Sequence, residues 1–559
     1  MSQPTVEVAL IDKAFINDII KGKVYASSTF NTGTRFSAMS LASAETDMKR
    51  TSARAYDGLT VYYGDLHNHC GLSYGHGSLS DALHNARLQL DFASVTVHAH
   101  WPDLPTNDPA LGYLVDYHNE GFRKAIDVWP HYLKTIERAN EEGVFVTFPS
   151  YEWHSMQYGD YCVYYQNGQG GAEARPIVRA TDLNDLRDGV KRLHTPVFMI
   201  PHHIAYQRGY RGINWSTFSD ELSPVAEIFS FHGLSETSEG PYPYLHSMGP
   251  RDERGTARHG WEQGHVFGAI GSTDHHNAFP GSYGYGRMGV WAESLSRDAI
   301  WAAISQRRTY ALTGDRIDLA FSVNDRPMGA ILEPANERWI EVAIRSTDTI
   351  DCVDVLYNNR TIHRESPCQQ PADSNVFSVG AEVGWGELVD QTIWDLTLEV
   401  SGGRLLTVQP RFRGYGPTDD PPDDANFAGI GWEEIVEGRR IRFFASTRQN
   451  PSLHTAATEG LVMQIEGDSQ TRLIVSGNGL EFVQPIVDLC KGARSYHIGS
   501  FVSPALSLHR AVPETETSYR FGFLHHKCSN RRDWYTVRVR QRNDQWAWSS
   551  PIWVGDANE

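Results

Sequence analysis

Two histidines stand directly after a short apolar run, in the sequence Asp-Leu-His-Asn-His of residues 65–69. Because side chains at i and i+2 of an extended chain point to the same side, His67 and His69 are aimed at one point. His76 follows seven residues after His69. Imidazole is the commonest protein metal ligand, and its neutral form is available near neutral pH. This segment predicts the front of a metal site.

Histidine is distributed unevenly along the chain. Residues 1–66 contain none, residues 67–276 contain 18, and the remaining residues contain 6. A solvated tag or a metal-buffering tract would gather histidines in a polar run, whereas here they are dispersed among apolar segments. The distribution therefore favours a folded polar site.

Five later strand ends carry further side chains of the same kind. Many histidines with a few carboxylates can hold two or three divalent ions, and closely spaced ions share a bridging hydroxide whose lowered pKa makes it a nucleophile at neutral pH. No cysteine cluster competes, so zinc, manganese and iron are all possible. For any one histidine a core or ligand-supporting role stays open, and only the set as a whole favours ligation. The predicted metal ligands are His67, His69, His76, His98, Glu152, His202, His232, Asp274 and His276.

Three residues near these ligands are predicted to be catalytic. His203 and His275 each stand beside a predicted ligand, as a general acid or as a contact to a bound anion, and support of the neighbouring ligand is an equal alternative. Arg287 closes a glycine-rich loop, residues 279–287. It would clamp an oxyanion, unless the loop is an ordinary flexible connection.

The elements that must position these side chains are of two alternating kinds. Apolar runs at 91–97, 144–149, 197–200, 226–231 and 266–271 predict buried strands. Residues 80–90, 117–142 and 182–193 have helical spacing, with Ser80 and Thr181 as N-caps. This alternation indicates an α/β fold with a parallel sheet, closed or partly closed into a barrel. In such folds the carboxyl ends of the strands converge on the site.

The length of 559 residues exceeds what one core usually supports. Residues 1–60 are predicted to be an N-terminal accessory segment, 61–318 the metal-binding barrel and 319–559 a β-rich, sandwich-like domain. Strand-like alternation begins after residue 318, for example at 319–323, 339–345, 394–400 and 534–540. The Pro/Asp-rich stretch 416–424 is predicted to be a surface loop.

The formal net charge of −18 argues against nucleic acid and anionic membranes as partners, because both require a basic surface. No apolar run is long enough to span a bilayer, and the start lacks a signal peptide. The six cysteines are scattered without a CxxC pair, which indicates free thiols in a reducing compartment. We therefore expect a cytoplasmic protein of unknown oligomeric state, whose metal cluster attracts a small anionic or sugar-like substrate.

The order of these motifs resembles that of the polymerase and histidinol phosphatase (PHP) superfamily. Its leading motif, D-L-H-x-H-T-x-x-S-D-G, is similar to residues 65–75, its T-D-H motif to 96–98 and its closing D-x-H to 274–276. Its glutamate motif resembles the segment of Glu152, and its later single histidines resemble His202 and His232. The resemblance covers about residues 61–318 and implies a distorted (β/α)7 barrel whose two- or three-metal site hydrolyses phosphoesters. Residues 291–293, 308–317 and 546–553 resemble a larger PHP-related bacterial family of poorly defined function.

Two acidic positions of the PHP pattern are replaced, by Val97 in T-D-H and by Tyr74 in S-D-G. His76, His100 and His154 could supply nitrogen ligands instead, and a changed ligand set can change the metal or the reaction. We predict a metal-dependent hydrolase, with a phosphoesterase favoured. Two alternatives stay open: a metal-dependent lyase or non-phosphate hydrolase on the same barrel, and a non-catalytic metal- or carbohydrate-binding protein.

Overall fold

The computed structural model describes residues 53–242, 244, 248–367, 374–386, 390–449, 457–527 and 531–556. All of them belong to one compact unit, residues 39–559. Residues 1–52 of the predicted accessory segment lie outside the described residues. Near the end of that segment the short 3-10 helix η2 (Arg54–Tyr56) joins the core, since the Tyr56 hydroxyl donates to the Phe321 carbonyl at 2.7 Å.

The first half of the chain starts a mixed sheet. β1 (Thr60–Asp65) pairs in parallel with β2 (Phe92–Ala93), which pairs in parallel with β4 (Val146–Thr147). On its other side β1 pairs antiparallel with β11 (Arg287–Ala292), and β11 pairs antiparallel with β12 (Thr309–Leu312). β1 changes from exposed to buried along its length. Its carboxyl end therefore enters the core at the point where His67 and His69 follow.

Two smaller sheets hold most of the other predicted strand ends. In one, β3 (Val97–His100) runs parallel to β5 (Ser150–Trp153), and β6 (Tyr161–Tyr165) pairs antiparallel with both β5 and β7 (Val197–Pro201). In the other, β8 (Val225–Ser230) pairs in parallel with β10 (Gly268–Gly271) and antiparallel with β9 (Gly233–Leu234). β5 to β8 and β10 are buried along their whole length, which explains why most of their residues are apolar or aromatic.

The fold is mixed α/β, and the predicted parallel barrel is not confirmed. The described strands form separate sheets, some mixed and some antiparallel, with no closed ring of ladder hydrogen bonds among them. The predicted strand 91–97 splits into β2 and β3, which belong to different sheets. β6 follows β5 after residues 154–160, a connection too short for the helical crossover that a parallel strand requires.

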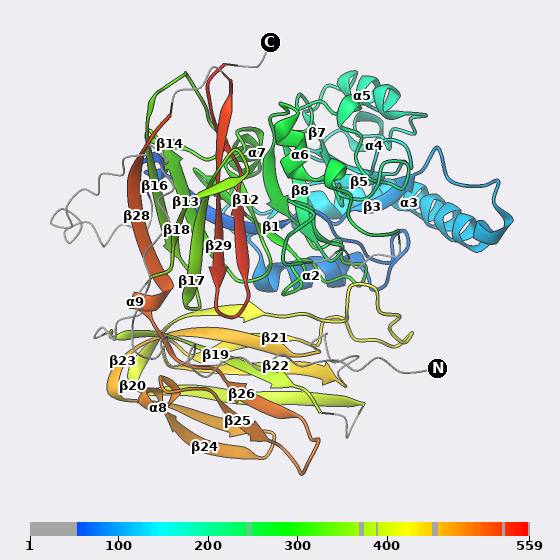
Figure 1. Ribbon diagram of the computed structural model, residues 1–559. Helices are drawn as coiled ribbons and strands as arrows, with labels where there is room; N and C mark the ends of the chain where they lie inside the picture. The colour runs from blue at the N-terminus through cyan, green and yellow to red at the C-terminus, as the bar shows by residue number, and fades with distance from the viewer. Residues whose placement is uncertain are drawn as a thin grey trace, which may run out of the picture. The chain divides into compact units, whose positions relative to one another are not determined.

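Helices form at the three predicted places as α2 (Leu79–Gln89), α3 (Gly112–Ala139) and α5 (Leu183–Lys191) (Figure 1). Their N-terminal ends differ from the prediction. The N-cap of α2 is Ser78. Its hydroxyl accepts the Asp81 N–H at 3.1 Å, and the Asp81 carboxylate accepts the Ser78 N–H, so the two residues form a reciprocal capping box. α5 is capped by Asp182. Within the described part of the chain no helix has both the length and the apolarity to cross a membrane. Shorter helices are α4 (Gly171–Ala174), α6 (Ala257–Glu262) and α7 (Arg297–Ser305).

Beyond residue 318 the described chain is mostly β, as predicted. β13 (Asp318–Val323), β16 (Glu337–Arg345) and β28 (Ser518–His526) form one antiparallel sheet. β17 (Ile350–Tyr357) pairs with β29 (Asp533–Gln541) in another. Phe321 and Val342 of the first sheet share an apolar core with Val355 and Val537 of the second, so two β layers enclose this core.

The last described strands return to the first half of the chain. β30 (Trp546–Ser549) pairs with β12, with Tyr310 opposite Ser549, and also with β29. β29 pairs in turn with β31 (Ile552–Val554). One sheet thus extends from β4 through β1 and β12 to β29, across residue 318. The domain limits 61–318 and 319–559 stay predictions.

A nine-stranded sheet forms from the segment after Glu365 (Figure 1, yellow-green to orange). In β22 (Arg440–Arg448) buried and half-buried residues alternate, as expected for a sheet with one face on a core. Trp394, Phe443 and Ile465 belong to that core. The other strands of this sheet are β19 (Val376–Gly384), β20 (Gln391–Arg411), β21 (Gly431–Val436), β23 (Glu459–Gly477), β24 (Leu480–Pro485), β25 (Arg494–His497), β26 (Ala505–Leu508) and β27 (Val512–Pro513). The short elements elsewhere are β14 (Arg326–Pro327), β15 (Ile331–Leu332), β18 (Arg360–Glu365), α8 (Ile486–Leu489) and α9 (Glu514–Thr517).

Candidate metal centre

All the predicted metal ligands except His76 lie close together in one buried cluster. At its centre His67 Nε2 and His69 Nε2 are 3.1 Å apart. Asp274 Oδ1 lies 3.3 Å from His67 Nε2 and 3.1 Å from His69 Nε2. None of these three side chains is more than 5% exposed. Together they form a group that could hold a metal ion.

Glu152 joins this group to its neighbours. Its Oε2 lies 3.5 Å from His69 Nε2 and 3.4 Å from His98 Nε2. Its Oε1 lies 3.0 Å from His202 Nε2. The ring centroids of His276 and His69 are 4.5 Å apart, and these two form a second candidate group with His98. A carboxylate whose two oxygens face different imidazoles is suited to bridge two cations.

Asp274 faces imidazoles with both of its oxygens, since Oδ2 lies 2.8 Å from His232 Nε2. Asp274 has a φ of +52° and His203 has a φ of +34°, in the left-handed region that non-glycine residues rarely adopt. Such conformations persist only where the surroundings hold them, and they cluster at functional sites. Here the Asp274 N–H donates to the His67 carbonyl at 2.7 Å, which fixes the turn after β10 against the strand end of β1.

The donor atoms of the cluster fit divalent cations. Among the described residues, Glu152 Oε2 and both ring nitrogens of His202 are buried without a hydrogen-bond partner, because the 3.0 Å contact of His202 to Glu152 lacks hydrogen-bond geometry. Buried polar atoms are nearly always partnered, so these indicate a missing ligand. Around a tetrahedral ion with bonds of about 2.0–2.1 Å, ligand atoms lie about 3.4 Å apart. The cluster's nitrogen–oxygen distances of 2.8 to 3.8 Å lie on both sides of this value.

The far nitrogens of the imidazoles hold their rings in place. His67 Nδ1 lies 3.0 Å from Glu227 Oε2, and His69 Nδ1 lies 2.9 Å from the Thr96 carbonyl. A proton on each Nδ1 leaves the Nε2 lone pair facing the cluster. Metal-ligating histidines in proteins are oriented in this way.

Burial keeps several of the imidazoles neutral. It lowers the pKa of His202 to about 4 and that of His276 to about 3, and neighbouring imidazoles add to the effect. Burial also holds the pKa of His98 well below its usual range, and His98 Nδ1 lies 2.9 Å from Ser73 Oγ. A metal binds the deprotonated form of its ligands, so these rings need lose no proton on binding.

Two of the predicted catalytic residues have other partners. His275 donates from Nε2 to the Tyr415 carbonyl at 2.8 Å and accepts a backbone N–H at Nδ1. Arg287 donates to the Gly281 carbonyl and to Gln89 Oε1, both at 2.7 Å. Both side chains are buried by these contacts, and the structure does not bring them into the cluster. Their catalytic roles stay predictions.

The predicted surface loop 416–424 lies against the cluster. The carbonyl of Pro417 accepts the His276 N–H at 3.0 Å. His276 is 23% exposed, more than the other histidines of the cluster, so the cluster reaches solvent on this side. The predicted ligand His76 is 42% exposed, with its Nε2 3.6 Å from Asp420 Oδ1, and lies outside the cluster.

Asp160 is a buried residue of the site that was not predicted from the sequence. The prediction considered only residues that follow the carboxyl end of a strand. Its Oδ2 lies 3.0 Å from His154 Nδ1 and 3.3 Å from His203 Nε2, and it accepts from Arg211 Nε at 2.7 Å. Asp160 precedes β6, and because β6 is antiparallel, its start lies at the edge where the neighbouring strands end. The resulting candidate metal group is Glu152, Asp160, His202 and His203.

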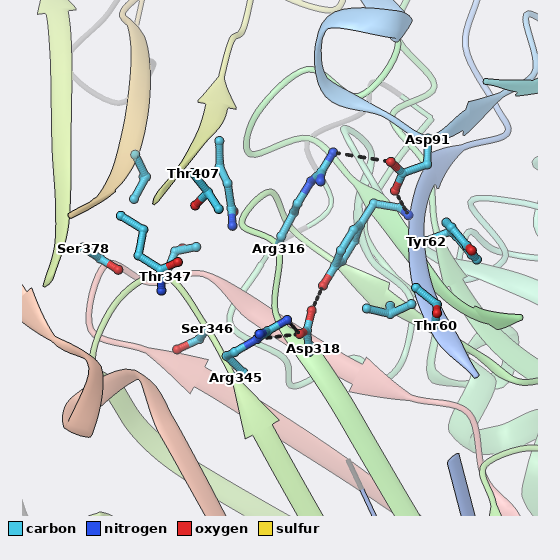
Figure 2. Close-up of a pocket in the computed structure, with 15 residues that line it drawn as sticks. Thr60, Tyr62, Asp91, Arg316, Asp318, Arg345, Ser346, Thr347, Ser378 and Thr407 are labelled. Atoms are coloured by element: carbon cyan, nitrogen blue, oxygen red, sulfur yellow. Dashed lines mark hydrogen bonds and ion pairs between the residues drawn. The ribbon is translucent and has the colours of Figure 1, made fainter. Parts of the chain in front are cut away.

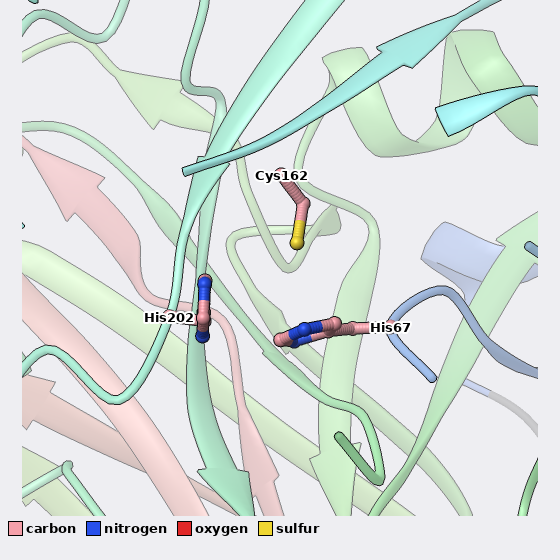
Figure 3. Close-up of side chains that lie close together, drawn as sticks. All are labelled: His67, Cys162 and His202. Carbon is pink, nitrogen blue, oxygen red and sulfur yellow. The ribbon is translucent and has the colours of Figure 1, made fainter. Parts of the chain in front are cut away.

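Cys162 was also missed as a site residue. From β6 its sulfur points into the space between His67 and His202 (Figure 3). It lies two residues after Asp160 and therefore on the same side of the strand. Burial raises the pKa of its thiol to about 12, so it is protonated without a bound cation.

Glu227 was not predicted either. The signal that could have revealed it is a lone charge in the apolar run 225–230.

Tyr74 stands where the PHP pattern has an aspartate. Its ring stacks on His98 with centroids 3.5 Å apart, and its hydroxyl lies 3.4 Å from His154 Nε2. Gly121 of α3 makes room for it, because a Cβ there would come within 2.5 Å of the Tyr74 ring. An aromatic ring thus covers this side of the cluster.

Replacing Glu227 by glutamine is expected to weaken metal binding by roughly tenfold to a hundredfold, because the carboxylate that orients His67 is lost. The dissociation constant for Zn²⁺ or Mn²⁺, measured by competition with a chelator, checks this. Glu120→Gln on the exposed surface of α3 is the control. Equal affinities of both variants would show that His67 does not depend on Glu227.

The fold and the cluster together define a mixed α/β protein with buried histidine and carboxylate groups that could bind metal ions. Residues 282–325 match a family described as "Protein of unknown function (DUF3604)".

Uncharacterized proteins of Chlamydia are similar to parts of the chain. One from Chlamydia muridarum is 28% identical over 173 residues, which is 28% of this chain and 28% of the relative. One from Chlamydia trachomatis serovar D is 29% identical over the same shares of both chains. The chain thus spans less than a third of the length of these curated relatives. One from Chlamydia pneumoniae is 22% identical over 43% of this chain and 41% of its own.

A solved structure from Bacteroides vulgatus is described as a two-domain protein containing a predicted PHP-like metal-dependent phosphoesterase. It is 15% identical, covers 56% of this chain and 85% of its own, and has a TM-score of 0.31. A TM-score of this size does not define a shared fold.

Proposed function

We propose that this protein is a metal-dependent hydrolase that acts on phosphoesters. The observation that carries the proposal is the buried cluster in which histidine Nε2 atoms and the carboxylate oxygens of Glu152 and Asp274 lie 2.8 to 3.8 Å apart. The order of the PHP-like motifs supports the same class. A distorted (β/α)7 barrel of PHP type is part of the proposal, supported by the parallel pairs β1–β2–β4, β3–β5 and β8–β10.

Two or three divalent cations, with manganese, zinc and iron as candidates, fit the donor set. When bound, such cations polarise a phosphoryl oxygen and lower the pKa of a coordinated water. They would also offset the charges of the two carboxylates, which would otherwise repel an anionic substrate. The residues that would hold them are His67, His69, His98, Glu152, His202, His232, Asp274 and His276.

The surrounding residues prepare the site for a small anionic or sugar-like substrate. Glu227 and the Thr96 carbonyl keep the two central imidazoles in one tautomer. The Arg211 guanidinium donates from Nε to Asp160 Oδ2 at 2.7 Å and lies 3.9 Å from Glu152 Oε1, so it offsets the charge of these carboxylates beside the cluster. The net charge of −18 argues against nucleic acid as the substrate.

Elemental analysis combined with a phosphoester screen tests this function. Protein purified without chelator is expected to contain two to three equivalents of Mn, Fe or Zn, and to hydrolyse at least one small phosphoester. His67→Ala is expected to lose both properties, while His84→Ala, at an exposed position of α2, retains them. Full hydrolysis by metal-free protein would refute the proposal, and so would a chain that takes up no metal.

A further inference from the structure

A polar cavity lies between β1 and the nine-stranded sheet (Figure 2). Its volume of about 340 Å³ falls within the range of small-molecule sites. Thr60 and Tyr62 line it from the start of β1, whereas His67 follows the opposite end of this strand. The cavity is therefore separate from the histidine cluster.

The charged side chains of this cavity cancel one another. Arg345 donates from Nε to Asp318 Oδ2 at 2.9 Å. Arg316 Nη2 lies 4.0 Å from Asp91 Oδ1 (Figure 2). With two cations and two carboxylates in the lining, neither an anion nor a cation meets an uncompensated opposite charge.

Hydroxyl and amide groups form the opposite wall. Gln464 of β23 lies between Ser378 of β19 and Thr407 of β20 in the strand register. Within the described ranges, the side chains of Gln464 and Thr407 have no hydrogen bond to another residue. Thr347 is 7% exposed, and among the described residues its Oγ1 has no partner although it is buried. Ser378, Thr347 and Thr407 lie across from Asp91 and Tyr62 (Figure 2).

We propose that this cavity binds a neutral saccharide. Sugar hydroxyls both donate and accept hydrogen bonds, as do the free amide of Gln464 and the hydroxyls beside it. Val61 and Val462 add apolar surface for the C–H groups of a sugar ring. The site is independent of the proposed hydrolytic centre.

Isothermal titration calorimetry of the full chain with neutral monosaccharides and disaccharides tests the proposal. At least one sugar is expected to bind at micromolar to millimolar concentration. Gln464→Ala and Thr407→Val are each expected to raise its dissociation constant about tenfold, the effect of losing a hydrogen bond. Gln470→Ala, at an exposed position of β23, is the control and is expected to leave binding unchanged.

Three results would overturn the proposal. They are an absence of sugar binding at millimolar concentration, equal binding by the wild type and both cavity variants, and tighter binding of glucose 6-phosphate or gluconate than of glucose. The melting temperatures of the variants show that a lost signal is not a folding defect. Asp274→Ala is expected to bind the sugar normally, so a failed metal centre and a failed sugar site give different results.

Discussion

Replacing Asp274 by alanine is expected to reduce kcat/KM for a phosphoester about a thousandfold or more and to remove bound metal. Asp274 Oδ1 lies within 3.3 Å of both central histidines and Oδ2 lies 2.8 Å from His232, so one change removes a ligand from two sides of the cluster. Loss of metal-based charge stabilisation costs several kcal/mol, and each 1.36 kcal/mol is a factor of ten in rate. Steady-state kinetics and elemental analysis measure the two effects.

Two further variants make this experiment decisive. Asp274→Asn preserves the shape of the side chain and removes its charge, so the same loss of activity with an unchanged melting temperature separates chemistry from folding. Asp127→Ala, on the exposed face of α3, is expected to behave as the wild type. Full metal content together with full activity in Asp274→Ala would remove this residue from the ligand set.

Replacing Asp315 by alanine is expected to lower the free energy of unfolding by about 3–5 kcal/mol, because a buried guanidinium loses its counter-charge. Arg411 donates to both oxygens of Asp315, at 2.8 and 2.7 Å. Gln541 and Asn543 also donate to Oδ2, at 2.8 and 2.7 Å. Urea unfolding at neutral pH measures the loss.

An exposed ion pair provides the control for this variant. Asp395 accepts from Arg442 with both oxygens at 2.8 Å, but the two side chains are 58% and 44% exposed. Asp395→Ala is therefore expected to cost less than about 1 kcal/mol. Equal losses in the Asp315 and Asp395 variants would show that burial does not strengthen the Asp315 pair.

The stabilising effect of Asp315 is expected to depend on pH. Burial alone would raise the pKa of Asp315, but Arg411, Asn543 and Gln541 outweigh it and lower this pKa. The carboxylate therefore stabilises the fold fully above its unfolded pKa of about 3.9, and this stabilisation is lost as the pH falls through the lower folded pKa. The stability difference between the wild type and Asp315→Asn should shrink below about pH 4. A constant difference down to pH 2 would contradict this.

Strand-end reasoning located most of the candidate site. Because β7, β8 and β10 are buried and mostly apolar, the polar residues that follow them converge as expected. The rule failed for Asp160, because antiparallel β6 presents its first residue at the shared edge. The rule also gives no information on ring orientation, since the His275 ring turns to the Tyr415 carbonyl more than a hundred residues away in the sequence. Such long-range contacts leave no local pattern in a single sequence.

The fold was predictable to a similar extent. Helical periodicity and strand-like alternation found α2, α3, α5 and the β-rich half, because both patterns are local. Sheet membership is not local. Nothing in residues 91–97 indicates that this run divides between two sheets, and nothing in residues 546–549 indicates that they pair with β12.

Four of the six cysteines, Cys70, Cys162, Cys352 and Cys490, are free thiols as predicted. Cys368 and Cys528 lie outside the described residues.

The pairing of β30 with β12 has a consequence for biosynthesis. A ribosome releases residues 309–312 more than two hundred residues before their partners at 547–549 emerge. During that interval one edge of β12 presents unpaired N–H and C=O groups, and exposed strand edges promote aggregation. A nascent chain of this protein therefore depends on temporary protection of that edge. A fragment that stops near residue 318 should precipitate where the longer chain does not.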